Sequence, residues 1–126
     1  MKYLLDTHAL IWAFSDIENL SGDVRRILNE ETEVCTSIVS LWEIGIKKSI
    51  GKLQVPFTAQ ELAKQCLSQS IEILPLQPYY IDMLSELPKK HNDPFDRIII
   101  AQAQTEHMVI ITKDSKIKLY DVPTLW

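Results

Sequence analysis

Short apolar runs alternate with segments of helical periodicity along the whole chain, and this alternation limits the possible folds more than any other feature of the sequence. A repeated strand–helix order predicts a mostly parallel central sheet with helices on both faces, which is an α/β fold. No repeat, low-complexity segment or long linker interrupts the pattern. The expected strands are residues 2–5, 33–37, 71–74, 108–112 and 122–125.

The helical segments between these strands carry their own start and stop signals. Val39, Trp42 and Ile46 recur at helical spacing, and Gly51 then supplies a stop. Thr58 followed three residues later by Glu61 forms a capping box. The expected helices are 7–14, 21–29 with Ser21 as cap, 38–50, 58–68, one after Pro78, one opened by Asp93, and a short turn after Asp114.

The length and composition suit one soluble domain, and we expect it to span residues 1–126. Hydrophobic residues make up 46% and charged residues 24%, which argues against disorder. No apolar run reaches the roughly 18 residues of a membrane span, and Asp6 and His8 interrupt any signal-peptide pattern, so we expect no membrane association and a cytoplasmic location. Cys35 and Cys66 lack a CxxC context and are predicted to be buried thiols.

Four acidic residues occupy positions that an ordinary soluble α/β domain would not need. Asp6 ends the first expected strand, and Asp114 follows the fourth. Glu43 falls among apolar residues of its helix, and Asp96 shares a helix face with Ile99. Because ligands of parallel sheets bind at the carboxyl ends of the strands, these four carboxylates are expected to converge there.

Simpler explanations exist for each acidic residue. Asp93 before Pro94 is a strong helix-start signal, so we assign it mainly to capping. In the first helical turn, Asp96 would gain roughly 0.3–1 kcal/mol from the helix dipole. Glu43 could pair with Lys47 one turn later, which contributes about 0.3–0.5 kcal/mol. Neither small term explains why Glu43 and Asp96 lie on buried faces.

If the four carboxylates converge, their repulsion has to be offset. Two like charges about 4 Å apart repel by ~1 kcal/mol in water and ~4 kcal/mol at an effective dielectric of 20. Either some of the groups are protonated or a divalent cation lies between them. We favour the cation, and an all-oxygen set suits Mg²⁺ or Mn²⁺. A cation so held can lower the pKa of a bound water and bind the oxygens of a phosphodiester.

Other nucleophiles and histidines give weaker signals. Ser37 and Ser40 lie near Glu43, but no histidine forms a recognisable triad with either, so capping and helix packing are their expected roles. His8 and His91 stand beside acidic motifs, where each could contact a phosphate or serve a purely structural role.

The strings LLDTHALIW, SIVSLWEIGIK, HNDPFDRIIIAQA and ITKD resemble, in order and spacing, the acidic motifs of PIN-domain ribonucleases, and among them the VapC-type toxins of toxin–antitoxin pairs. The similarity extends over the whole chain, including VPTLW at its end. It implies a PIN-like parallel sheet, a Mg²⁺- or Mn²⁺-dependent endoribonuclease, a homodimer, and inhibition by an antitoxin protein in the active-site groove.

Carried over by position, the resemblance places the acidic site residues at Asp6, Glu43, Asp96 and Asp114. We expect Asp6 and Asp96 to bind the metal directly, and Glu43 and Asp114 to act through water or on a second ion. Asp93 is a second candidate within its motif, although we place it outside the metal shell. The hydroxyl found beside the last aspartate in many members corresponds to Thr112, a predicted substrate contact.

The net charge of −4 does not favour binding of an RNA backbone, but the basic residues are unevenly placed. Nine of the thirteen lie next to acidic motifs, and they could form a basic rim or simply be solvated. Arg97 is the strongest candidate, because its side chain is expected to face away from the packed side. The nine are Lys47, Lys48, Lys52, Lys89, Lys90, Arg97, Lys113, Lys116 and Lys118. Trp12 and Trp42 are predicted to be packing or interface residues rather than platforms for bases.

Two other classes of protein are considered. A phosphoacceptor receiver domain has similar size and an acidic Mg²⁺ pocket, but it needs an aspartate after a strand near the middle of the chain. This sequence has no aspartate between Asp23 and Asp82, which weighs against a receiver. The second class is a catalytically silent member of the same fold that binds RNA or a protein partner.

Overall fold

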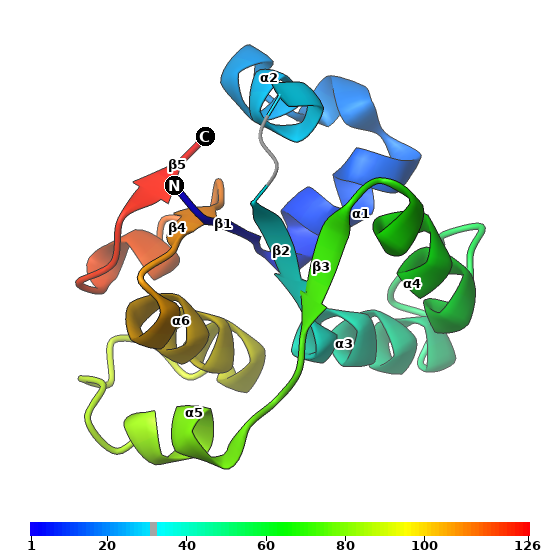
Figure 1. Ribbon diagram of the computed structural model, residues 1–126. Coiled ribbons are helices and arrows are strands. Elements are labelled where there is room, and N and C mark those ends of the chain that lie inside the picture. The colour runs from blue at the N-terminus through cyan, green and yellow to red at the C-terminus, as the bar shows by residue number, and fades with distance from the viewer. Residues whose placement is uncertain (31–32) are drawn as a thin grey trace.

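The computed structural model describes residues 1–30 and 33–126, and a parallel sheet with helices on both faces forms its centre (Figure 1). Within these residues the sheet has five strands in the order β3-β2-β1-β4-β5, and every neighbouring pair is parallel. The predicted α/β fold is therefore confirmed. The strands are β1 (Tyr3–Leu5), β2 (Val34–Ser37), β3 (Ile71–Leu74), β4 (Val109–Ile111) and β5 (Thr124–Leu125).

The helices follow the predicted segments closely. Thr58 and Glu61 form both bonds of the expected capping box. Two short 3₁₀ helices also occur within the described residues. The first, η1, had no sequence signal, because three residues are too few to show a period. The last strand is shorter than expected, since Pro123 at its start has no N–H to donate. The helices are α1 (Thr7–Ser15), η1 (Ile17–Asn19), α2 (Gly22–Glu30), α3 (Ile38–Ser49), α4 (Ala59–Ser68), α5 (Pro78–Met83), α6 (Pro94–Glu106) and η2 (Ile117–Leu119).

The strand order contains one reversal of direction. The chain builds outward from β1 to β2 and β3, then returns to place β4 on the other side of β1. Crossover connections therefore leave the carboxyl ends of β1 and β4 in opposite directions, an arrangement at which open α/β sheets usually bind their ligands. Receiver domains have the order 2-1-3-4-5, so the topology also excludes that class.

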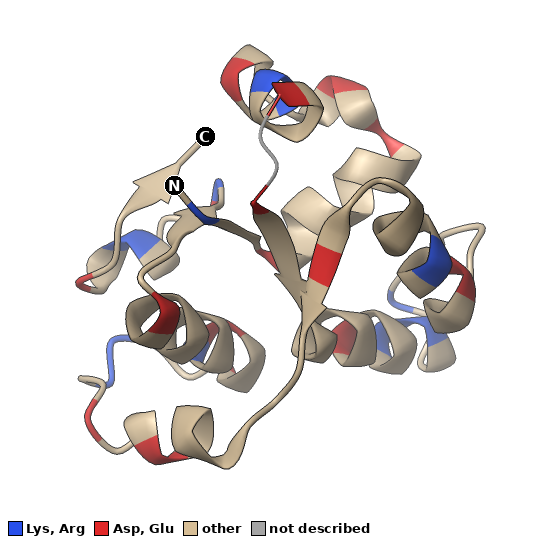
Figure 2. Ribbon diagram, in the orientation of Figure 1, with Lys and Arg blue, Asp and Glu red and all other residues tan. Residues whose placement is uncertain are grey.

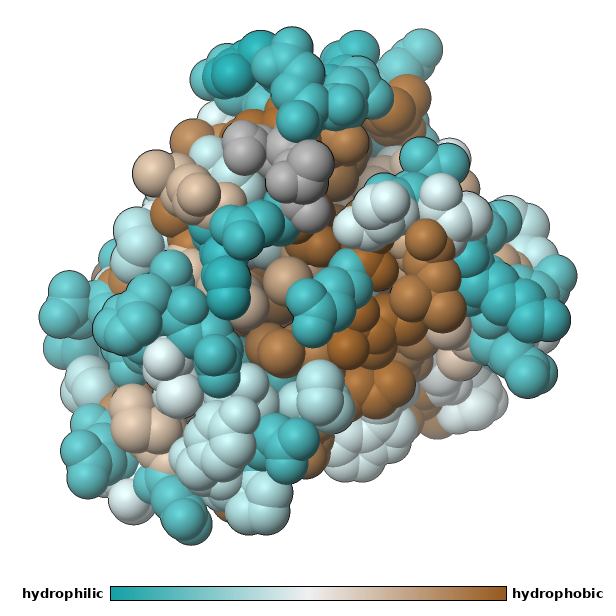
Figure 3. All heavy atoms as spheres, in the orientation of Figure 1, coloured by the Kyte–Doolittle hydropathy of each residue, from teal (hydrophilic) through white to brown (hydrophobic). Residues whose placement is uncertain are grey.

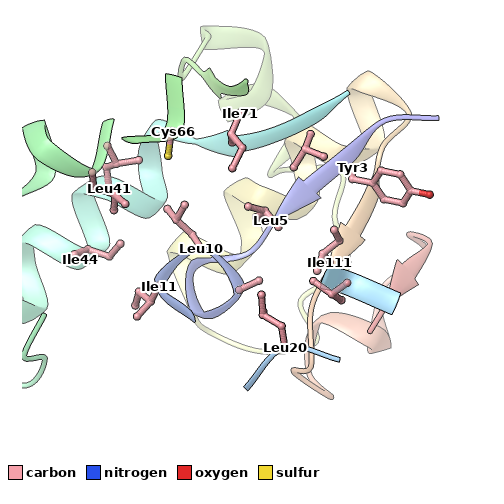
Figure 4. Close-up of a cluster of buried hydrophobic side chains, with 14 of the residues drawn as sticks. Tyr3, Leu5, Leu10, Ile11, Leu20, Leu41, Ile44, Cys66, Ile71 and Ile111 are labelled. Carbon is pink, nitrogen blue, oxygen red and sulfur yellow. The ribbon is translucent and has the colours of Figure 1, made fainter. Parts of the chain in front are cut away.

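Alternating side chains of the strands fill two separate cores. Leu5 of β1 points to the face covered by α1, α2, α3 and α4, where it packs with Leu10, Leu41 and Ile44 (Figure 4). Leu4 points to the opposite face, which α6 covers. Each fully buried aliphatic side chain contributes roughly 1.5–3 kcal/mol, so the sheet is held from both sides.

Several smaller predictions can be compared with the structure. Cys35 and Cys66 are buried free thiols, as expected, and burial raises the pKa of each to about 11. Trp12 packs on the first core, with its ring centroid 5.6 Å from that of Trp126. Trp42 is 61% exposed and contacts Phe95 edge-on, so it is not a core residue, and its alternative role at an interface stays a prediction. No described helix has both the length and the apolar character needed to cross a bilayer.

The start of α6 depends on Asp93, as the sequence predicts. Its Oδ1 accepts hydrogen bonds from the backbone N–H groups of Phe95 (2.9 Å) and Asp96 (3.0 Å). Pro94 occupies the first helical position, where its missing N–H is not needed. The cap thereby fixes the turn that carries Asp96.

We expect Asp93→Ala to lower the free energy of unfolding by about 1 kcal/mol, because two N–H groups of the first turn lose their acceptor. Urea denaturation of the two proteins measures this difference. Asp93→Asn is the matched control, since it removes the charge and keeps the capping oxygen. An alanine variant as stable as the wild type would contradict the capping role.

Candidate metal centre

Asp6 lies between β1 and α1, at the point where the strand order reverses. Its backbone N–H donates to Ile111 O (3.1 Å), its Oδ1 caps α1 by accepting from Ala9 N (2.9 Å), and its Oδ2 accepts from Thr112 Oγ1 (2.6 Å). The side chain is almost wholly buried, and this desolvation raises the pKa of Asp6. The ends of β1 and β4 are thus held together by a buried carboxylate.

Glu43 lies on the inner face of α3, as its helical position predicts, and is 3% exposed. Its Oε1 accepts from Thr7 Oγ1 (2.6 Å), and its Oε2 pairs with the Lys47 ammonium (2.6 Å). The hydrogen bond to Glu43 is the main cause of a raised Lys47 pKa. The ion pair considered from sequence therefore exists, but its acidic partner is buried.

Asp96 occupies the first turn of α6 and is 9% exposed. Burial is the main cause that raises its pKa to about 6, with further contributions from the charges of Asp93, Asp114 and Glu43. A hydrogen bond between Asp96 Oδ2 and His91 Nε2 (3.1 Å) opposes this shift. Carboxylates from three parts of the chain therefore raise the pKa of the buried Asp96 side chain.

Asp114 completes the acidic group from the loop after β4. Its backbone N–H donates to Thr112 Oγ1 (3.0 Å), and its Oδ1 accepts from Lys116 N (2.8 Å). The half-buried Asp114 carboxylate raises the pKa of both Asp6 and Asp96 through its charge. Asp114 thus links Asp6 electrostatically to Asp96, which is also linked to Glu43.

The donor chemistry of this group fits a divalent cation, although the side chains are not arranged around a common point. All four are carboxylates, two have raised pKa values caused by burial, and their charges repel. Yet no group of three or more His, Cys, Asp or Glu side chains in the described ranges is placed to hold a metal ion. The reason is that Glu43 is turned toward Lys47 and Thr7, and Asp6 toward Thr112.

Both residues predicted to contact substrate have internal partners. Arg97 does not face away from the packed side as expected: its guanidinium donates to Pro88 O (3.2 Å), Leu84 O (3.3 Å) and Tyr120 Oη (3.1 Å). Thr112 is fully buried between Asp6 and the Asp114 backbone. These contacts hold both side chains against the rest of the fold, and a role of either residue in substrate binding stays a prediction.

The basic residues near the acidic motifs fall into two groups. Lys47 pairs with Glu43, and Lys48 donates to Phe57 O, so α3 carries an acidic band followed by basic ones (Figure 2). Arg97 also has partners within the protein. The other six of the nine have exposed side chains, and they are Lys52, Lys89, Lys90, Lys113, Lys116 and Lys118.

Some residues of the site have no clear sequence signal. Thr7 donates to Glu43 and lies 3.0 Å from Ser40 Oγ, so it links α1 to α3. Ser37 caps α3 by accepting from Val39 N (3.1 Å), as predicted. Tyr120 lies 29 residues after His91 yet contacts its ring nitrogen Nδ1 (2.8 Å). His8 is exposed and stacks against Trp12.

Comparisons with known proteins agree with this fold. A family model described as PIN domain matches residues 3–123. A search of curated proteins finds no significant match. Among solved structures, VapBC2 from Rickettsia felis bound to a promoter DNA fragment gives a TM-score of 0.72 at 17% identity, covering 99% of this chain and 98% of the other. DNA-bound VapBC from Salmonella typhimurium gives a TM-score of 0.73 at 21% sequence identity, covering 99% of this chain and 97% of the other. A toxin–antitoxin complex from Klebsiella pneumoniae gives a TM-score of 0.63 at 17% sequence identity, covering 99% of this chain and 97% of the other. At these identities the structural matches show the shared fold.

We expect Thr112→Val to lower the free energy of unfolding by about 1–3 kcal/mol, because a buried Asp6 oxygen and the Asp114 N–H both lose a partner. Thermal unfolding followed by circular dichroism measures the change. Thr112→Ser keeps the hydroxyl and should retain most of the stability. A valine variant as stable as the wild type would show that the hydroxyl does not stabilise this site.

The raised pKa of Asp96 predicts a particular pH dependence. Between about pH 4 and pH 6 the folded protein binds more protons at Asp96 than the unfolded chain does, so the free energy of unfolding falls as pH rises through this window. In chelator at about pH 7, Asp96→Asn should therefore be more stable than the wild type by about 1–2 kcal/mol.

Urea denaturation at about pH 4.5 and pH 7 measures this difference, and the advantage of the asparagine variant should shrink at the lower pH. The groups facing Asp96 are His91, Asp93, Asp114, Glu43 and Lys47, so their variants are not suitable controls. Asp82→Asn on the exposed side of α5 is the matched control and should show no such trend. An asparagine variant less stable than the wild type at both pH values would contradict the prediction.

Proposed function

Because the chain belongs to the PIN domain family, we propose that it is a metal-dependent endoribonuclease and the toxin of a toxin–antitoxin pair. One observation carries the proposal: carboxylates from the end of β1, from α3, from α6 and from the loop after β4 act electrostatically on one another near the reversal of strand order, although they are not arranged around a common point. Crevices at such reversals are the usual ligand sites of open α/β sheets.

Burying these four acidic side chains in their charged form costs free energy unless a cation offsets the charge. Glu43 and Asp6 are at most 4% exposed, and removing a carboxylate from water costs several kcal/mol unless it is paired and hydrogen-bonded. Only Glu43 has a direct Lys partner among the described residues. A Mg²⁺ or Mn²⁺ ion would offset the charge that remains on Asp6, Asp96 and Asp114.

We assign Asp6 and Asp96 as the direct ligands, and Glu43 and Asp114 as residues that act through water. When bound, a divalent cation supplies Lewis acidity and a water of lowered pKa. The chain itself orients the ligands: Thr112 holds Asp6, and Thr7 holds Glu43. Asp93 caps α6 through Oδ1, and we place it outside the proposed shell.

RNA as substrate is proposed from the resemblance of the acidic motifs and from exposed lysines beside them. Lys89 and Lys90 precede α6, and Lys113 and Lys116 flank Asp114. These side chains could neutralise backbone phosphates near the acidic group despite the net charge of −4.

The proposed protein partners are an antitoxin and a second copy of the chain. The structural neighbours include toxin–antitoxin complexes. In this chain a groove of about 590 Å³ lies between α3 and α4, lined in part by Ile38, Trp42 and Ala63. Figure 3 shows hydrophobic surface on the face that carries β3 and α4, and Leu67 of α4 is 65% exposed. Apolar surface of this kind suits contact with another protein.

The nuclease proposal predicts metal-dependent cleavage of a mixed RNA pool. We expect cleavage in Mg²⁺ or Mn²⁺, none in chelator, and a rate lower by a factor on the order of 10² or more in Asp96→Asn, because a direct metal ligand is lost. Gel analysis of end-labelled RNA measures the rates, and a DNA pool of the same length tests the choice of substrate.

Asp82→Asn should cleave like the wild type, because Asp82 is exposed on α5. Equal cleavage by the wild type and Asp96→Asn would indicate a contaminating nuclease. Together with retained RNA binding, that result would favour the catalytically silent binding module.

A further inference from the structure

The hydroxyl of Tyr120, just after η2, is a meeting point for the segment that precedes α6. It lies 3.2 Å from the backbone nitrogens of both Lys90 and His91, and 3.1 Å from Arg97 Nη1. It also lies 2.8 Å from His91 Nδ1. Four groups therefore surround one phenolic oxygen.

Counting protons at this oxygen fixes the direction of each bond. The two backbone N–H groups and the guanidinium can only donate, and a phenol has one proton of its own. With three donors directed at the oxygen, the phenolic proton is directed to the remaining neighbour, His91 Nδ1. Nδ1 must then accept, and the neutral ring carries its proton on Nε2.

The proton on Nε2 points to the candidate metal centre. Nε2 lies 3.1 Å from Asp96 Oδ2, so the ring donates to that carboxylate. The side chains of His91 and Asp96 are only 8% and 13% exposed, and the imidazole packs edge-on against the Tyr120 ring. The carboxylate is therefore held in one orientation through Oδ2, and Oδ1 has no hydrogen-bond partner in the described residues.

We propose that His91, with its tautomer set by Tyr120, is a positioning residue that holds Asp96 Oδ2 and directs Oδ1 to the metal. The inference rests on the proposed metal-dependent function. It adds two residues, His91 and Tyr120, that the acidic positions alone do not include. Histidines and carboxylates that hold metal ligands in this way commonly change metal affinity by about 10–100-fold when removed.

The first measurement is the tautomer of His91 by ¹⁵N NMR of the metal-free protein, which a general structural role would not fix. We expect the Nε2–H form in the wild type and a mixture of tautomers in Tyr120→Phe, where the phenolic proton is absent. The signal is assigned by its loss in His91→Gln. An Nδ1–H ring in the wild type would overturn the proposal.

The second measurement is Mn²⁺ affinity by titration calorimetry, without RNA. We expect His91→Ala to bind about 10–100-fold more weakly, and His91→Gln, whose amide can still donate to Asp96, to bind within about threefold of the wild type. His107→Asn is the matched control, because it lies at the far end of α6 in a left-handed conformation that asparagine tolerates. Circular dichroism verifies that each variant is folded.

The outcomes separate this inference from the proposed function. If the wild type binds Mn²⁺ and cleaves RNA while His91→Ala binds the ion equally tightly, the positioning role is wrong and the nuclease proposal stands. If the wild type neither binds Mn²⁺ nor cleaves, the nuclease proposal and the metal-directing role both fail. The tautomer result then decides whether the Tyr120–His91–Asp96 link exists as a structural one.

Discussion

The structure depends on burying several carboxylates at one edge of a parallel sheet. Asp6, Glu43 and Asp96 are all under 10% exposed, and an unpaired buried charge costs several kcal/mol. At the reversal between β1 and β4, Asp6 at the end of β1 is hydrogen-bonded to Thr112 just after β4. A residue that is hard to bury therefore lies where the ligands of open α/β sheets usually bind.

Hydrogen-bond donors from different elements offset the free-energy cost of burying these carboxylates. Thr112 after β4 donates to Asp6, Thr7 of α1 and Lys47 of α3 contact Glu43, and the segment before α6 contacts Asp96 through His91. Each donor therefore also ties two elements together. These bonds hold the carboxylates apart, so cation binding would require Glu43 or its neighbours to exchange a protein partner for the ion.

Helix α3 connects the acidic centre with the apolar surface. Glu43 and Lys47 lie on its inner side, whereas Ile38 and Trp42 line the groove against α4. Trp42 illustrates the limit of helical periodicity: its spacing matches a core position, but it lies at the margin of the buried stripe and remains 61% exposed. Helical periodicity predicts which side of a helix is buried, but the width of the buried stripe depends on how the neighbouring helix packs against it.

The sequence by itself determined the elements, the caps at Asp93 and Thr58, and the inward positions of Glu43 and Asp96, because these follow from local periodicity and hydrogen bonding within a few residues. Tertiary structure alone decided the strand order and the partners of the carboxylates that are distant in sequence. Thr112 and Asp6 are 106 residues apart, and Tyr120 and His91 are 29 apart. No local pattern encodes such pairs, since they form only when β4 pairs with β1 and α6 packs on the sheet. Arg97 shows the same limit, because its position on the helix did not reveal the carbonyl groups that bind its guanidinium.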